Sequence, residues 1–150
     1  MPNREVHVRV GGVTGAGFAT YLAWGQPGSH VLAEAVGGIA GGIGGGLLPD
    51  CVDTPYSPRH RAEAHSRSIS GALGYFVSDQ LPVWQASLRK QAEYYAQMRA
   101  VASDLLSQIG YGILEFLFRF LAGAFAGLLA GYASHLALDF LTPACLPVLC

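Results

Sequence analysis

The sequence predicts an all-α membrane protein: a polytopic helical bundle of about four transmembrane helices plus one amphipathic helix, folded as a single domain over residues 1–150. Apolar residues make up 51% of the chain and charged residues only 13%, which is about half the charged fraction of a typical soluble domain. Glycine is frequent, at 20 residues. The net charge of -1 argues against electrostatic binding of nucleic acid, so we expect none.

The first two apolar stretches, Val10–Trp24 and Val31–Leu48, predict a helical hairpin. Glu34 is the one charged residue in them, and the segment between them, Gly25–His30, has the glycine and proline content of a turn. Residues 1–9 are too polar for a cleavable signal peptide, and we expect none.

The third stretch, Ser68–Trp84, contains Asp79 and Pro82, and the sequence leaves open whether it crosses the bilayer or only dips into it. After it, Gln85–Gln108 combines charged and amide side chains with apolar residues at helix-like intervals. This pattern predicts an amphipathic helix outside the hydrocarbon region, or an extension of the fourth helix beyond it.

The fourth stretch, Ile109–Leu141, is the clearest transmembrane candidate. Glu115 and Arg119 interrupt it four positions apart, a spacing at which they can pair. Near its end, His135 and Asp139 are one helical turn apart and therefore share a face.

Glycines recur at every fourth position in two of the apolar stretches, which predicts helices packed at close range. The rows are Gly37, Gly41 and Gly45, with Gly38, Gly42 and Gly46 beside them, and Gly123, Gly127 and Gly131. A flexible loop is the alternative for residues 37–46, but unpaired loop backbone is not tolerated in lipid, which favours a helix.

If all four stretches cross the membrane, both termini and the Leu48–Arg67 loop lie on one side. That side carries Arg4, Arg9, Arg59, Arg61 and Arg67, whereas the other carries Arg89, Lys90 and Arg99. The excess of positive charge predicts a multi-pass protein with cytoplasmic N- and C-termini.

The same topology gathers most of the candidate metal ligands at the cytoplasmic boundary, and leaves only His30 among the histidines on the other side. The candidates are His7, Asp50, Asp53, His60, His65, His135 and Asp139. Imidazole nitrogens mixed with carboxylate oxygens suit zinc, manganese or iron, and a divalent cation would compensate the cost of desolvating His135 and Asp139. Zinc is the ion that we expect.

The same residues also have interpretations that involve no metal. His135 and Asp139 can form a hydrogen bond within a packed bundle, and His60 and His65 can belong to a solvated basic loop near anionic headgroups. Taken alone, His7 is incidental and Asp50 marks the water interface.

Three segments resemble the YdjM-like family of inner-membrane metal-dependent hydrolases: Leu48–Asp53, His60–Ser66 and Gly131–Pro143. Their patterns are similar to the family's L-P-D-x-D, H-R-x-x-x-H-S and G-Y-x-x-H-x-x-x-D-x-x-T-P elements. The first element here reads D-C-V-D, where the family has D-x-D followed by histidine.

The resemblance implies a protein of a bacterial-type inner (cytoplasmic) membrane and gives roles to individual residues. It implies metal ligation by His7, Asp50, His60, His65, His135 and Asp139. It also implies that Arg61 and Ser66 contact the substrate or support the ligands, and it assigns no metal-ligand role to Asp53, because the first element here reads D-C-V-D.

From these observations we expect a membrane-bound metal-dependent hydrolase acting on an ester or phosphoester of an amphiphilic, lipid-like substrate. Arg61 would bind a phosphate, and Asp53 or Asp50 would serve as general base. The alternative is a non-catalytic membrane scaffold with a structural metal site. In either case membrane lipid is a partner, and glycine-ridged helices could form a homo-oligomer.

Overall fold

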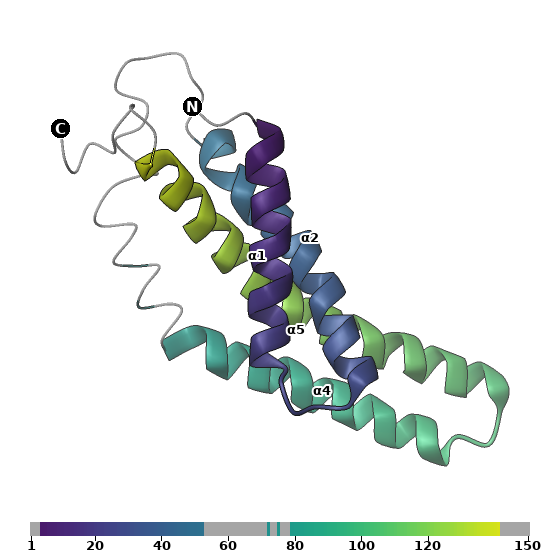
Figure 1. Ribbon diagram of the computed structural model, residues 1–150. Coiled ribbons are helices and arrows are strands. Elements are labelled where there is room, and N and C mark those ends of the chain that lie inside the picture. Colours follow the sequence, from purple (N-terminus) through teal and green to yellow (C-terminus); the bar gives the residue numbers. More distant parts are fainter. Residues whose placement is uncertain (1–3, 53–71, 73–74, 76–78, 142–150) are drawn as a thin grey trace.

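The computed structural model describes residues 4–52, 72, 75 and 79–141. Over these residues the chain forms the helices α1 (Arg4–Leu22), α2 (Gly28–Val52), α4 (Leu81–Val101) and α5 (Leu105–Phe140), and no strand (Figure 1). The prediction of an all-helical protein is therefore confirmed for the described part of the chain.

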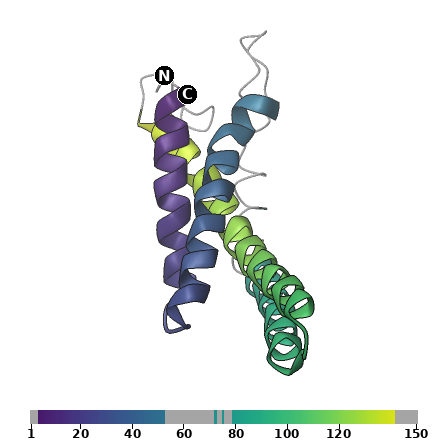
Figure 2. The ribbon, with the colours of Figure 1, turned by 90° about the vertical axis from the view of Figure 1, so that its right-hand side faces the viewer.

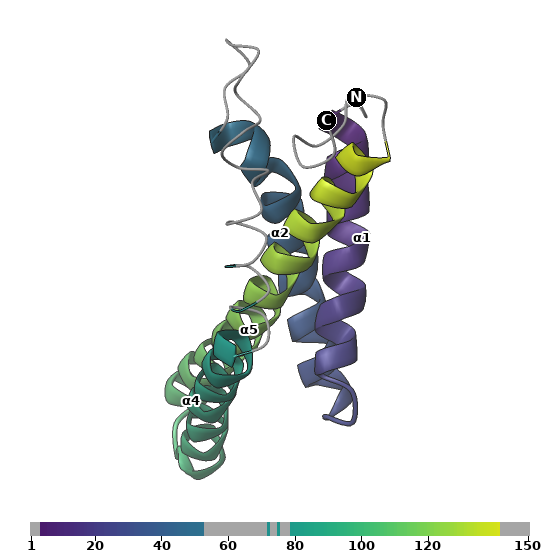
Figure 3. The same ribbon diagram turned by 90° about the vertical axis from the view of Figure 1, so that its left-hand side faces the viewer.

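The helices form two hairpins, α1–α2 and α4–α5, and α5 contacts each of the other three helices. α2 makes its most extensive contact with α5, α1 packs on both, and α4 runs along the first part of α5. Figures 2 and 3 show the α4–α5 hairpin diverging from the α1–α2 hairpin toward one end. At the other end, the start of α1 and the ends of α2 and α5 come together (Figure 1).

The turn of the first hairpin lies where the sequence predicts it. α1 ends at Leu22, Gly25 adopts a positive φ of 87° that glycine accommodates without strain, and α2 begins at Gly28. Both helices are longer than predicted. His7 therefore lies inside α1 rather than before it, and Asp50 lies inside the last turn of α2 rather than after it.

The glycine rows of α2 are helical and pack at backbone distance, as predicted. A Cβ atom on Gly42 would collide with the carbonyl of Gly11 on α1, and a Cβ atom on Gly41 would collide with the carbonyl of Ala124 on α5. One row of α2 thus faces α5, while the neighbouring row lies between α1 and α5. These rows bring the three helices close enough to share one set of side chains.

The predicted division between the third stretch and the amphipathic segment is wrong. α4 runs unbroken from Leu81, with Pro82 in its first turn, where a missing N–H costs nothing. It ends before Ala102, whose backbone is extended, and the Asp104 side chain then caps α5 by accepting a hydrogen bond from Ser107 N at 2.8 Å. The segment is therefore a separate helix antiparallel to α5, and most of residues 68–80 lies outside the described part.

Glu115 and Arg119 have other partners than each other. Glu115 pairs with Arg99 at 3.0 Å and with His30 at 3.2 Å, while Arg119 lies 3.7 Å from Glu34. Partners from α2 and α4 thus replace the predicted pair within α5.

Two of the described helices are long and apolar enough to cross a membrane: Gly28–Asp50 of α2 and Leu105–Asp139 of α5. Membrane association is supported to this extent.

Candidate metal centre

The centre is built on the last two turns of α5. His135 and Asp139 lie one turn apart, and His135 Nε2 is 3.3 Å from Asp139 Oδ2. His135 is fully buried and Asp139 is 6% exposed. A carboxylate this deeply buried needs a positive partner, so the pair is more than a surface contact.

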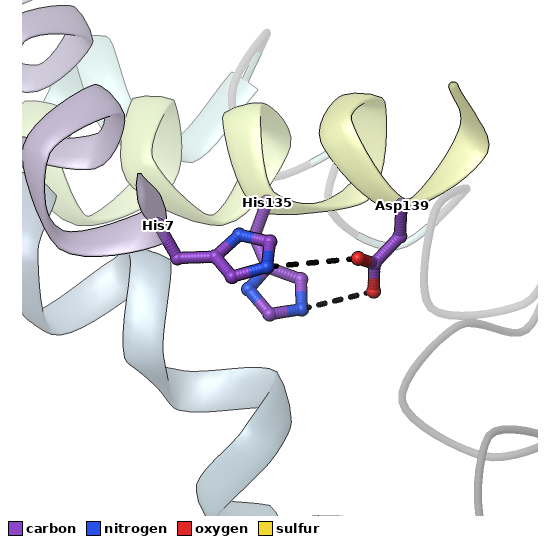
Figure 4. A group of neighbouring side chains, drawn as sticks. All are labelled: His7, His135 and Asp139. Atoms are coloured by element: carbon purple, nitrogen blue, oxygen red, sulfur yellow. Dashed lines mark ion pairs between the residues drawn. The ribbon is translucent and has the colours of Figure 1, made fainter. Parts of the chain in front are cut away.

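His7 reaches the same carboxylate from α1. Its Nε2 atom lies 3.6 Å from Asp139 Oδ1, so each oxygen of Asp139 faces one imidazole (Figure 4). The two imidazole rings are stacked, with centroids 4.0 Å apart and planes inclined by 25°. The Nε2 atoms of both rings therefore face the carboxylate of Asp139.

The Gly46 carbonyl on α2 fixes the protonation pattern of His135. His135 Nδ1 lies 2.7 Å from this oxygen, and a carbonyl only accepts hydrogen bonds, so Nδ1 is the donor. In the neutral ring, Nε2 then carries a lone pair, and Nε2 faces Asp139 Oδ2 and also Asp50 Oδ1 at 3.7 Å. A lone pair and two carboxylates repel one another unless a proton or a cation lies between them.

The residues fit a divalent cation. One donor atom from each of His7, His135 and Asp139 lies within 4.8 Å of the others, and all three residues are buried. Two donor atoms that each lie about 2.2 Å from one ion are up to about 4.4 Å apart. The spacing of the three donor atoms is close to this value. Two imidazole nitrogens with a carboxylate oxygen suit zinc, manganese or iron, and the Gly46 contact is the second partner that a metal-binding histidine usually has.

The predicted convergence of distant residues is therefore observed for four positions: His7 from α1, Asp50 from α2, and His135 with Asp139 from α5. Asp50 differs from the others because its side chain is 53% exposed and contacts the group from the rim. His30 lies at the other end of α2, away from this group, as predicted, and its partner there is Glu115. Five further predicted positions lie outside the described residues: Asp53, His60, Arg61, His65 and Ser66.

Sequence reasoning did not identify Gly46 as a member of the site. The residue contributes a backbone oxygen, so its side chain carries no chemical signal. Its place one turn before Asp50, at the end of a glycine row, is the feature that could have indicated it.

An apolar groove of about 610 Å³ runs along the seam between α1 and α5. It begins at Val10, one turn after His7, and Leu138, next to Asp139, also lines it. The hydroxyls of Thr14 and Ser134 bond to carbonyls of their own helices at 2.8 Å, so the groove wall stays largely apolar.

A scan against models of known protein families, a search of curated proteins and a search of solved structures each found no match to the chain.

Proposed function

We propose that this protein is a multi-pass membrane hydrolase, similar to the YdjM-like family, with a metal site at the cytoplasmic boundary of the membrane. The observation that carries the proposal is the buried group of His7, His135 and Asp139, together with the rim carboxylate of Asp50. The three side chains come from distant parts of the chain. Burying a carboxylate and two imidazoles costs desolvation free energy unless a proton or a cation compensates it.

The membrane part of the proposal is four crossings with both termini cytoplasmic. Large apolar side chains are exposed along the helices, including Val13 at 74%, Leu32 at 64% and Ile113 at 61%. Tyr21 in the last turn of α1 and Trp24 just after the helix are exposed by 73% and 82%, and amphipathic rings of this kind favour the lipid headgroup level. Exposure of this kind is favourable in lipid and unfavourable in water.

When bound, a divalent ion would supply Lewis acidity toward a phosphoryl or acyl oxygen and would acidify a water molecule. His7, His135 and Asp139 would hold the ion, and Gly46 would keep Nε2 of His135 in the deprotonated form. Asp50 at the solvent-facing rim, or Asp53, would accept a proton from the attacking water. Arg61 and Ser66 would contact the substrate.

The groove between α1 and α5 supports an amphiphilic substrate. An acyl chain lying against Phe18 and Leu129 would leave its polar head near His7 and Asp139, beside the part of the groove that Val10 and Leu138 line. An ester or phosphoester at that head would then lie beside the metal ligands. This arrangement favours lipid-like over water-soluble substrates.

Turnover of a lipid-like phosphoester by the purified, metal-loaded protein tests the function. Asp139→Asn keeps the side-chain shape but removes the charge facing both imidazoles, so it should abolish turnover. His30→Gln alters a histidine at the opposite end of α2 and should leave turnover unchanged. Loss of activity in both variants, or in neither, would contradict the proposal.

A metal-stabilised scaffold is the second candidate, favoured by one observation. His7, His135 and Asp139 join α1 to α5, and Asp50 at the rim belongs to α2, so an ion that also bound Asp50 would fasten the three helices together. If the metal-loaded parent is folded and no ester or phosphoester is turned over, while metal removal loosens the bundle, this candidate is correct. An oligomer formed through the glycine rows would have to exchange contacts that these rows make within the chain.

A further inference from the structure

A polar cavity, separate from the apolar groove, lies at the end of the bundle opposite the metal centre. It has a volume of about 200 Å³ and lies between the start of α2, the end of α4 and the first half of α5. Its polar lining consists of Ser29, His30, Arg99, Glu115 and Arg119. None of these residues takes part in the proposed hydrolase site.

The charges around this cavity are buried to an unusual degree. Arg119 is 3% exposed and Glu115 is 7% exposed, while Glu34 behind them is fully buried. Charged groups inside a membrane protein are costly, and they are generally retained where they serve a function.

In the lining of the cavity, the two guanidinium groups of Arg99 and Arg119 face one carboxylate, that of Glu115. Arg89 grips both oxygens of Glu34, with Nε at 2.9 Å from Oε1 and Nη2 at 2.6 Å from Oε2, and so neutralises it. The half-exposed Arg99 pairs with Glu115 through a single contact, with Nη1 at 3.0 Å from Oε2. Because Arg89 holds Glu34 outside the lining, the cavity wall itself carries an excess of one positive charge.

The remaining contacts of Arg119 do not remove this excess. Its Nη1 atom bonds to the neutral amide of Gln26. Its Nη2 atom lies 3.7 Å from Glu93, whose side chain is 63% exposed and therefore strongly screened by water.

Two buried nitrogen atoms in the cavity wall have no hydrogen-bond partner among the described residues. They are Nε of Arg119 and Nδ1 of His30; one carboxylate oxygen of the wall, Glu115 Oε2, also lacks a hydrogen bond and has the ion pair with Arg99 instead. The arginine nitrogen can only donate, so the group that satisfies it must be an acceptor. A buried donor without an acceptor is costly, which indicates a ligand that supplies oxygen atoms.

We propose that this cavity binds a small oxyanion of the phosphate class, held by Arg119 inside and Arg99 at the mouth. Guanidinium groups match the geometry of phosphate oxygens, and the anion would cancel the excess positive charge. Ser29 offers a further donor in the wall. The anion is either free phosphate or the phosphodiester of a lipid headgroup at this membrane boundary.

A pair of glycines in α5 provides a test that keeps every charge. Gly112 lines the cavity, and a Cβ atom there would contact Arg99 at an ordinary 3.5 Å, so Gly112→Val should fold while filling the space. Gly110, one half-turn away, has no atom within 4 Å of an added Cβ, so Gly110→Val is the matched control. Titration of the purified protein with inorganic phosphate at constant ionic strength should give binding that Gly112→Val loses and Gly110→Val keeps. Arg99→Gln, at the half-exposed mouth, should weaken the affinity about tenfold or more.

A lipid arm separates the two sources of the anion. If phosphate does not bind, the proteins are incubated with phosphatidylcholine vesicles that contain phosphatidylglycerol. The parent and Gly110→Val should then retain phosphatidylglycerol, and Gly112→Val should not. Either pattern supports the proposal and identifies the source. Binding of neither probe, or binding that is equal in both glycine variants, would overturn it.

Discussion

His135 Nδ1 lies 2.7 Å from the carbonyl oxygen of Gly46, and this hydrogen bond joins the end of α5 to the end of α2. It determines which imidazole nitrogen can ligate a metal, because Nδ1 is occupied as a donor. The close approach of the two helices makes the bond feasible, since a Cβ atom on Gly42 or Gly131 would collide with neighbouring backbone. Glycine packing and the chemistry of the centre are therefore linked.

The close approach of α1 and α2 gives a first prediction. Gly42→Ala should destabilise the fold by about 1–3 kcal/mol, because the added methyl group meets the Gly11 backbone, which has little room to move. Gly44→Ala is the control on the same helix: its Cβ would meet only Leu128 Cδ1 at 3.9 Å, and the better helix propensity of alanine should stabilise it by up to about 1 kcal/mol. Reversible unfolding in mixed micelles measures both, and equal effects would contradict the packing.

The bidentate contact between Arg89 and Glu34 gives a second prediction. Arg89→Met should cost about 3–5 kcal/mol of unfolding free energy, because it leaves the fully buried Glu34 carboxylate without its main partner. Lys90→Met changes a neighbouring exposed cation and should cost less than about 0.5 kcal/mol. Similar losses in both variants would mean that Glu34 is not held by Arg89.

Much of the fold follows from the sequence, because apolar stretches, glycine spacing and the Gly25–His30 turn are local signals. The pairing of His135 with Asp139 follows from their spacing on one helix. The convergence of His7 and Asp50 on this pair was predicted from the expected topology, although each residue lies inside a helix rather than beside one.

The charged cluster at the other end was not predictable in the same way. Arg89 and Glu34 lie on different helices, and their contact depends on how α4 packs along α5. Glu115 and Arg119 have a spacing that predicts mutual pairing, but nearer partners on α2 and α4 replace it. Glu34, the one charge in its apolar stretch, was the signal that a buried partner exists.

The cap of α5 gives a third prediction. The Ser107 amide donates to Asp104, and this hydrogen bond lowers the pKa of the Asp104 carboxyl below its usual 3.8. Because the folded pKa is the lower one, the cap contributes fully above pH 3.8 and is lost as the pH falls through the folded pKa. The Ser107 amide proton, followed by NMR, should titrate with a midpoint below 3.8 in the parent and should not titrate in Asp104→Asn. A midpoint at or above 3.8 would contradict the cap.

The groove between α1 and α5 gives a fourth prediction, which rests on the proposed function. Ala133→Phe should fill the groove and raise KM for a long-chain substrate, while leaving kcat for a short soluble ester unchanged. Ala86→Phe, at an exposed position of α4, is the control and should change neither. An equal effect on long and short substrates would exclude the groove as the acyl-chain site.

The metal content of the purified protein tests the central claim most directly. After loading with zinc and removal of excess ion, elemental analysis should find bound metal in the parent and in His30→Gln, and should find little in His135→Gln, which lacks the imidazole between Asp139 and Asp50. Chelation should also lower the melting temperature of the parent but not that of His135→Gln. A parent that holds no zinc, manganese or iron above background, or a His135→Gln variant that holds as much as the parent, would contradict the account.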